Sequence, residues 1–177
     1  MLQKGQTPPD ISVNSVSGRP VSLNALRGKK VLVKFHRFSG CPVCRYQTHE
    51  LIKRQPELNA AGIETLLFMH SSKNKILANF KEVEGLHIIA DKEKVFYNKY
   101  SSAFSWKKLF NLSTWGATFA AIFKGFFPHF DKFEGGVTGV PSDFLLDETG
   151  NIKALKYGKH YGDSWTVEEV LNMAGRS

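Results

Sequence analysis

The chain has 177 residues, of which 42% are hydrophobic, and it carries a formal net charge of +8. This length suits one globular domain with a hydrophobic core, so we expect a single domain over residues 1–177. Residues 1–10, MLQKGQTPPD, lack the apolar run of a secretory signal, and no run of about 18 uncharged apolar residues occurs in the chain. The sequence therefore predicts neither a signal peptide nor a membrane span, and the expected compartment is the cytoplasm.

Basic residues outnumber acidic ones by 24 to 16, but they are spread along the chain. Segments such as SSKNKIL, KEVE and DKEKV mix lysines with acidic and apolar residues, as an ordinary solvated surface does. Nucleic acid rewards clustered positive charge, so we do not expect it as a partner. A basic surface could equally favour an acidic protein partner.

The first half of the chain predicts alternating strands and helices. Residues 11–23, ISVNSV, SGRP and VSL, are typical of a short β-hairpin. Buried strands are predicted at VLVKF, IETLLFMH and LHIIA, residues 31–35, 63–70 and 86–90. A helix is predicted from Pro42 to about Ala61, ended by Gly62 and kinked or interrupted at Pro56, and a second helix at residues 73–84. This order predicts a βαβαβ unit with parallel strands.

The second half contains a segment that breaks this alternation. Residues 104–130 are rich in aromatic side chains and are interrupted by glycine and proline, within an insertion at about 101–134. We interpret the segment as helical core or as a cover over the sheet; a substrate lid, a dimer face and a membrane-surface segment are alternatives. Residues 139–157 then predict two strands joined by the turn DETGN, and Thr166 with Glu169 has capping-box spacing before a final helix.

Both cysteines of the chain lie in one motif, Cys41-Pro42-Val43-Cys44, between a predicted strand and a predicted helix. A permanent disulfide is not expected in a reducing compartment, which leaves reactive or metal-binding thiols. A C-x-x-C that opens a helix in a βαβ unit is typical of thioredoxin-like redox motifs. The helix N-terminus stabilises a thiolate, so Cys41 at the N-cap is the predicted nucleophile, with Pro42 at the first helical position. Cys44 returns to the same helical face and is the predicted resolving thiol.

These features resemble those of a known family. VLVKFHRFSGCPVCRYQTHEL, with the hairpin before it and the late GVPSDFLLDETGNI, is similar to the peroxiredoxin-like redoxins of the alkyl hydroperoxide reductase/thiol-specific antioxidant superfamily. The resemblance covers nearly the whole chain and is sharpest at Phe35, Arg37, Cys41-Pro42, Cys44, Arg45 and Glu50. It implies an α/β thioredoxin-like fold, with a central mixed sheet flanked by helices, the hairpin as an N-terminal extension and the aromatic segment as a helical insertion.

The resemblance also implies an activity and further site residues. Val140-Pro141 stands where thioredoxin-like proteins keep a cis-proline beside the dithiol, so Pro141 is expected to face Cys41 and to leave the backbone of Val140 open to an extended substrate. The implied activity is antioxidant thiol oxidoreduction, in which Cys41 and Cys44 reduce disulfides or hydroperoxides. An external thioredoxin- or glutathione-like thiol system then restores the dithiol, without a metal or organic cofactor. A homodimer is left open.

The chain departs from the usual peroxiredoxin pattern, Pro-x-x-x-Thr/Ser-x-x-Cys. Counting back from Cys41 puts Phe38 at the hydroxyl position, and counting back from Cys44 puts Cys41 there. Neither register supplies the hydroxyl that orients a peroxide, although Ser39 is near and Arg37 could stabilise a thiolate and a developing oxyanion. The choice between a peroxide and a disulfide substrate therefore stays open.

Other polar residues near the motif have two interpretations each. His36 and His70 end predicted strands on the side where a parallel α/β fold places its site; they could tune Cys41 or be partly exposed without a catalytic task. Arg45 could lower the thiol pKa or be only solvated. Asp143 and Asp147 are candidate proton acceptors for the resolving thiol, although Asp147 is more simply a turn residue.

Two alternative functions remain beside thiol oxidoreduction. One is a non-catalytic binding module with a thioredoxin fold, which would have inert thiols and would use the aromatic segment to hold a partner. The other is a zinc site made by Cys41, Cys44, His49 and a distant ligand. The histidines form no H-x₃₋₅-H pair to complement the cysteine pair, which disfavours zinc.

Overall fold

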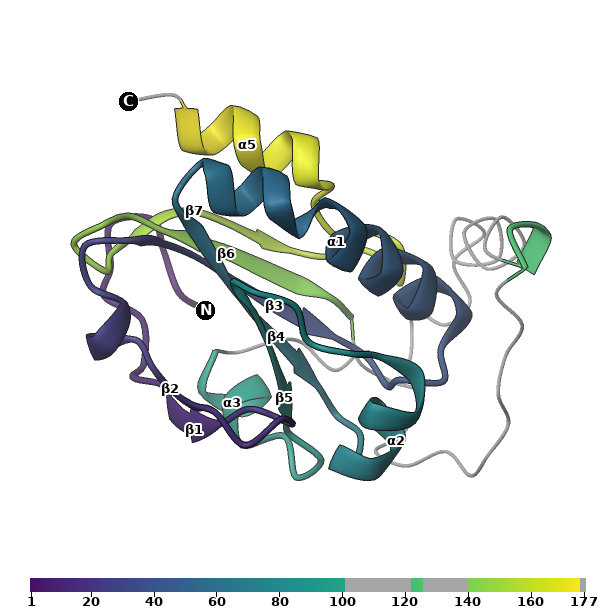
Figure 1. The fold of residues 1–177 in the computed structure, drawn as a ribbon. Helices are drawn as coiled ribbons and strands as arrows, with labels where there is room; N and C mark the ends of the chain where they lie inside the picture. The colour runs from purple at the N-terminus through teal and green to yellow at the C-terminus, as the bar shows by residue number, and fades with distance from the viewer. Residues whose placement is uncertain (101–121, 126–139, 176–177) are drawn as a thin grey trace.

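The computed structural model describes residues 1–100, 122–125 and 140–175. Its centre is a five-stranded sheet with the order β5-β4-β3-β6-β7 (Figure 1). Strands β3 (Lys30–His36), β4 (Ile63–Met69) and β5 (Leu86–Ala90) are parallel, joined through helices α1 (Pro42–Ala60) and α2 (Lys73–Asn79). Strand β6 (Ser142–Leu146) lies antiparallel to β3, and β7 (Ile152–Tyr157) lies antiparallel to β6. The predicted βαβαβ unit and the mixed sheet are therefore confirmed.

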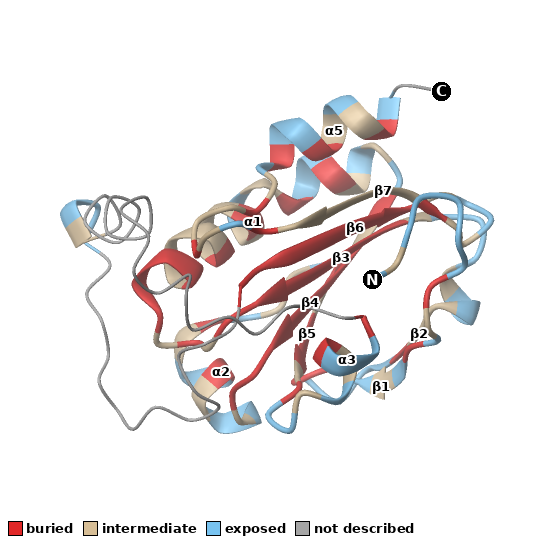
Figure 2. Ribbon diagram, turned by 180° about the vertical axis from the view of Figure 1, so that it is seen from behind, coloured by how far each residue is buried: buried red, intermediate tan, exposed pale blue. Residues whose placement is uncertain are grey.

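Helices cover both faces of the sheet, as Figures 1 and 2 show. One face packs against α1 and α5 (Val167–Gly175), and the other against α3 (Val95–Lys99) and the N-terminal hairpin. Successive strand residues point to opposite faces, so Leu32 enters the core under α1 whereas Val31 and Val33 enter the core under α3. Both faces of the central strands are consequently buried, which explains their continuous apolar sequences.

The hairpin forms where the sequence predicts it, from β1 (Ser12–Asn14) and β2 (Pro20–Ser22), and is followed by the 3₁₀ turn η1 (Asn24–Leu26). Glu82 connects it to the sheet: this carboxylate accepts hydrogen bonds from the Ile88 amide at 2.7 Å and from the Ser15 hydroxyl at 3.1 Å. Helix α2 stops at Asn79, so the prediction of a helix to residue 84 is wrong. Phe80 has an extended backbone (φ −138°, ψ 149°) because its ring enters the core. This extended backbone directs the chain, with Glu82, toward β5.

Helix α1 continues through Pro56 to Ala60, so an interruption at this proline is not observed, whereas the predicted end near Gly62 is confirmed. Pro56 lies on the exposed side of the helix. Its neighbours Gln55 and Leu58 are fully buried, and the Gln55 amide donates to the carbonyl of Gly85 at 3.0 Å. Packing of this buried face holds the helix together despite the missing backbone donor.

The C-terminal elements also follow their local signals. Asp147 accepts hydrogen bonds from the amides of Thr149 and Asn151, each at 3.0 Å, in the turn between β6 and β7. Thr166 and Glu169 form the predicted capping box: each side chain accepts a hydrogen bond from the other residue's amide, at 2.7 and 3.3 Å. The predicted aromatic insertion lies outside the described residues except for 122–125. Across the described ranges, no helix has the length and apolarity needed to cross a membrane.

Candidate active site

The two cysteines lie at the carboxyl end of β3, where α1 begins. Cys41 is the N-cap residue, with extended dihedral angles of −69° and 124°, and Pro42 opens the helix as predicted. Cys44 follows within the first turn. Both are free thiols, with exposures of 2% and 1%, and they pack with Val43 and Phe38. The β3–α1 connection therefore places both sulfurs at the end of the sheet where α/β proteins carry their sites.

The surroundings of the two thiols shift their pKa values in opposite directions. The Cys44 thiol donates a hydrogen bond to the Cys41 sulfur, and this bond is the largest cause that lowers the pKa of Cys41 to about 6. The Arg37 guanidinium and the amides of Cys44 and Val43 act in the same direction, and burial opposes them. The same bond from Cys44, together with burial, raises the pKa of Cys44 well above its ordinary value. At neutral pH the charge is therefore on Cys41 and the proton on Cys44.

Arg37 provides the positive charge beside Cys41. Its Nη1 donates to the Cys41 sulfur at 3.5 Å, and its side chain is only 5% exposed. The guanidinium carbon lies 3.5 Å from the centre of the Tyr161 ring and 5.3 Å from the centre of the Phe38 ring. Sequence reasoning did not find Tyr161, because a tyrosine in a distant loop carries no local signal of this contact.

Arg45 and the two histidines near the motif differ in burial and in charge. Arg45 is half-buried on α1. Burial is the larger cause that lowers the pKa of His49, and the charge of Arg45 acts in the same direction. His36 and His70 are fully buried, so the interpretation of partly exposed residues is wrong. Burial lowers the pKa of each to about 3, and both rings are neutral at physiological pH. Neither histidine therefore supplies positive charge to the thiolate.

Asp143 is part of a buried ion pair. Its carboxylate lies 2.9 Å from the Lys34 ammonium, with exposures of 0% and 3%, and the two residues face each other across β3 and β6. It also accepts hydrogen bonds from the Ser164 hydroxyl at 3.0 Å and the Trp165 amide at 2.6 Å. These bonds attach the segment before α5 to the sheet. Asp147 lies at the opposite end of β6, where β3 begins, so its candidacy as a proton acceptor for Cys44 is wrong.

Comparison with known proteins identifies the family. A model of the AhpC/TSA family matches residues 4–155. The chain belongs to this family. Peroxiredoxin 2 of Thermoplasma acidophilum is 35% identical over 104 residues, which are 55% of this chain and 52% of that relative. Chloroplastic peroxiredoxin Q of Sedum lineare is 35% identical over 65 residues, 37% of this chain and 35% of that one. The chain thus matches about half the length of these relatives or less.

Solved structures confirm the predicted thioredoxin-like fold. The reduced 2-Cys peroxiredoxin of Plasmodium vivax superposes with a TM-score of 0.67 at 18% identity, covering 97% of this chain and 79% of that one. Peroxidoxin BcpB of Mycobacterium tuberculosis superposes with a TM-score of 0.69 at 10% identity, over 100% of both chains. The resemblance that the sequence predicts is therefore confirmed at the level of family and fold.

One expectation drawn from the family resemblance, a cis bond at Val140-Pro141, is wrong. The peptide bond between these residues is trans, and Val140 is 2% exposed. The Pro141 carbonyl accepts a hydrogen bond from the Gly158 amide at 2.9 Å, which extends the pairing of β6 with β7. The trans form is the favoured one for an X–Pro bond, and this pairing is compatible with it. Because Ser142 pairs with Phe35, Pro141 still lies near the cysteine end of the sheet.

Ser39 does not replace the hydroxyl that the usual family pattern provides. Its amide and its hydroxyl both bond to the Ser71 hydroxyl, at 2.9 and 3.2 Å, and both residues are buried. These bonds tie the β3–α1 connection to the segment after β4. We interpret Ser39 as a structural residue of the site.

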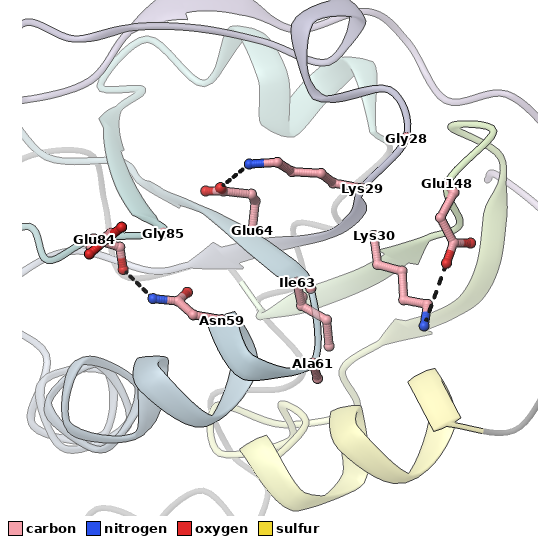
Figure 3. Close-up of a pocket in the computed structure, with 11 residues that line it drawn as sticks. Gly28, Lys29, Lys30, Asn59, Ala61, Ile63, Glu64, Glu84, Gly85 and Glu148 are labelled. Atoms are coloured by element: carbon pink, nitrogen blue, oxygen red, sulfur yellow. Dashed lines mark hydrogen bonds and ion pairs between the residues drawn. The ribbon is translucent and has the colours of Figure 1, made fainter.

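Neither metal-ligand clusters nor a groove at the other end of the sheet points to a site elsewhere in the described part of the chain. In the described part of the chain, no group of three or more His, Cys, Asp and Glu residues could hold a metal ion. A groove of about 400 Å³ lies where β3 and β4 begin, at the end of the sheet opposite Cys41 (Figure 3). Four of the charged side chains that line it form ion pairs, Lys29 with Glu64 at 2.8 Å and Lys30 with Glu148 at 3.5 Å. The thiol pair is therefore the candidate active site.

Proposed function

We propose that this AhpC/TSA family member is a single-domain thiol oxidoreductase in which Cys41 is the nucleophile and Cys44 the resolving thiol. The observation that carries the proposal is the Cys41 sulfur, which accepts hydrogen bonds from the Cys44 thiol and from Arg37 at a helix N-terminus. A thiolate, not a thiol, attacks peroxides and disulfides. The names of the peroxiredoxin relatives support a hydroperoxide as one substrate class.

The proposed reaction has two steps and a regeneration. The Cys41 thiolate attacks the terminal oxygen of a hydroperoxide; an S–O bond forms, the O–O bond breaks, and the alkoxide takes a proton and leaves as an alcohol or water. Cys44 then gives up its proton and attacks the Cys41 sulfenic acid, which releases water and forms the Cys41–Cys44 disulfide. An external thioredoxin- or glutathione-like thiol system supplies two electrons and two protons to restore the dithiol. With a disulfide substrate, the first step forms a mixed disulfide and releases a thiolate.

Burial of the nucleophile favours a hydroperoxide as the first substrate. Cys41 is 2% exposed, so a small molecule reaches its sulfur with less rearrangement than a protein disulfide needs. Cys44 lies within hydrogen-bonding reach of Cys41, so the second step requires only a short approach of the two sulfurs. Arg37 lies where it can stabilise both the thiolate and the leaving oxygen.

The test is the oxidation rate of the reduced protein by hydrogen peroxide and by a small aromatic disulfide, followed by stopped-flow absorbance. We expect fast peroxide consumption that Cys41→Ser abolishes, whereas Cys44→Ser stops at a sulfenic acid that dimedone labels. Fast reaction with the disulfide alone, and a mixed disulfide trapped on Cys41 in Cys44→Ser, would replace the peroxidase with an exchange enzyme. Rates no higher than that of free glutathione with both reagents would overturn the catalytic proposal in favour of a binding module.

A further inference from the structure

Two segments far apart in the chain meet at the charge beside Cys41. Arg37 follows β3, and Tyr161 belongs to the connection between β7 and α5. The guanidinium carbon lies 3.5 Å from the centre of the Tyr161 ring, and both side chains are 5% exposed. We propose that Tyr161 is a positioning residue whose ring holds the Arg37 guanidinium against the Cys41 sulfur and so sets the reactivity of this thiol. The inference rests on the proposed thiol chemistry.

The ring restricts a side chain that is otherwise flexible. Arginine has several rotatable bonds, and a buried guanidinium needs partners that compensate its lost hydration. Stacking on the face of an aromatic ring attracts the cation and confines its plane. The bond from Arg37 to the Cys41 sulfur spans 3.5 Å, and its strength falls as the guanidinium moves away. Removing the ring would loosen the hold on the guanidinium beside the sulfur.

The connection that carries Tyr161 is itself held on both sides. The Gly158 amide donates to the carbonyl of Pro141 at 2.9 Å, and a Cβ at position 158 would lie only 2.7 Å from that oxygen. On the side of α1, the Gln47 amide donates to the carbonyl of Gly162 at 3.1 Å. These contacts fix the backbone next to Tyr161 on both flanks. The ring is therefore a preorganised platform for the guanidinium.

Among the residues that the structure describes, the ionisable groups that interact electrostatically with the Cys41 sulfur are Cys44, Arg37 and Tyr161. Burial raises the pKa of the Tyr161 hydroxyl, so the hydroxyl is neutral through the range in which Cys41 titrates. The ring, rather than the hydroxyl, carries the proposed role. Tyr161→Phe keeps the ring and removes the hydroxyl, which makes it the matched control for Tyr161→Leu.

The experiment measures the pKa of Cys41 in the reduced, full-length protein, from the thiolate absorbance at about 240 nm and from the pH dependence of alkylation. We expect Tyr161→Leu to raise this pKa by about one unit, and Tyr161→Phe to leave it unchanged. In an Arg37→Met background, Tyr161→Leu should have no further effect, because the ring acts through the guanidinium.

An unchanged pKa in Tyr161→Leu, with a native circular dichroism spectrum, would overturn the inference. Equal shifts in the Leu and Phe variants would also overturn it, since the hydroxyl would then carry the effect. If Tyr161→Leu does not fold, Tyr161→Phe still decides the question, because a rise of about one unit in this variant contradicts a role of the ring. A wild-type pKa in the ordinary range for cysteine would instead refute the proposed function, so the two failures are distinguishable.

Discussion

Replacing Cys44 with alanine tests which contact makes Cys41 a thiolate. The bond from the Cys44 thiol is the largest of the causes that lower the pKa of Cys41 to about 6, ahead of Arg37 and the helix amides. A hydrogen bond to a charged group is worth about 1.5–3 kcal/mol, and one pKa unit corresponds to about 1.4 kcal/mol. We therefore expect Cys44→Ala to raise the pKa of Cys41 by about one to two units.

The assay is an absorbance titration between pH 4 and pH 10, with iodoacetamide rates as a second readout. Cys41 is the only thiol left in Cys44→Ala, so the titration belongs to one group, whereas the first proton lost by the wild type belongs to the pair. Cys44→Ser keeps a donor at position 44 and should shift the pKa less than the alanine variant. A pKa that stays near 6 in Cys44→Ala would refute the reasoning and assign the thiolate to Arg37 and the helix N-terminus.

Three further predictions concern stability. Lys34→Met leaves the buried Asp143 carboxylate without its cation and should lower the free energy of unfolding by about 3–5 kcal/mol in urea titrations, with partial recovery when Asp143→Leu is added; a loss below about 1 kcal/mol would contradict a buried pair. Burial lowers the pKa of His36 and His70 from 6.5 to about 3, so below pH 6.5 the unfolded chain binds protons that the folded chain does not bind. The free energy of unfolding should therefore decrease as the pH is lowered, by about 1.4 kcal/mol per pH unit for each ring, down to a pH of about 3. His70→Phe should remove the contribution of His70 to this slope, and an unchanged slope would disprove that His70 is buried as a neutral ring. Thr166→Ala removes one half of the capping box and should cost about 1 kcal/mol in thermal melts, whereas Thr166→Ser should cost much less.

Most of the fold follows from local signals in the sequence. Apolar runs predict the buried strands, Gly62 marks the end of α1, and the spacing of Thr166 and Glu169 predicts the start of α5. The errors come from tertiary contacts that override local preference. Helix α2 ends early because Phe80 is drawn into the core, and α1 passes Pro56 because its opposite face is buried.

The candidate site likewise has a part that the sequence predicts and a part that only the structure shows. One short motif contains Arg37, Cys41, Pro42 and Cys44, so the sequence alone predicts that these residues lie close together. The contact of Tyr161 with Arg37, and the facing of Lys34 and Asp143 across two strands, depend on pairings between distant segments. The trans bond at Val140-Pro141 shows that a resemblance transfers a position more reliably than a conformation.

Arg37 interacts with both thiols of the candidate site. The guanidinium bonds to Cys41, and the Arg37 backbone amide lowers the pKa of Cys44, so one residue at the end of β3 contacts both thiols. Because β3 is paired on both sides, by β4 and β6, this end of the strand is held firmly beside the two thiols. Formation of the thiolate therefore needs no hydroxyl at position 38, where the chain has phenylalanine. The missing hydroxyl bears only on the orientation of the peroxide oxygen, and so the pKa of Cys41 and the rate with peroxide are separate properties that variants can change independently.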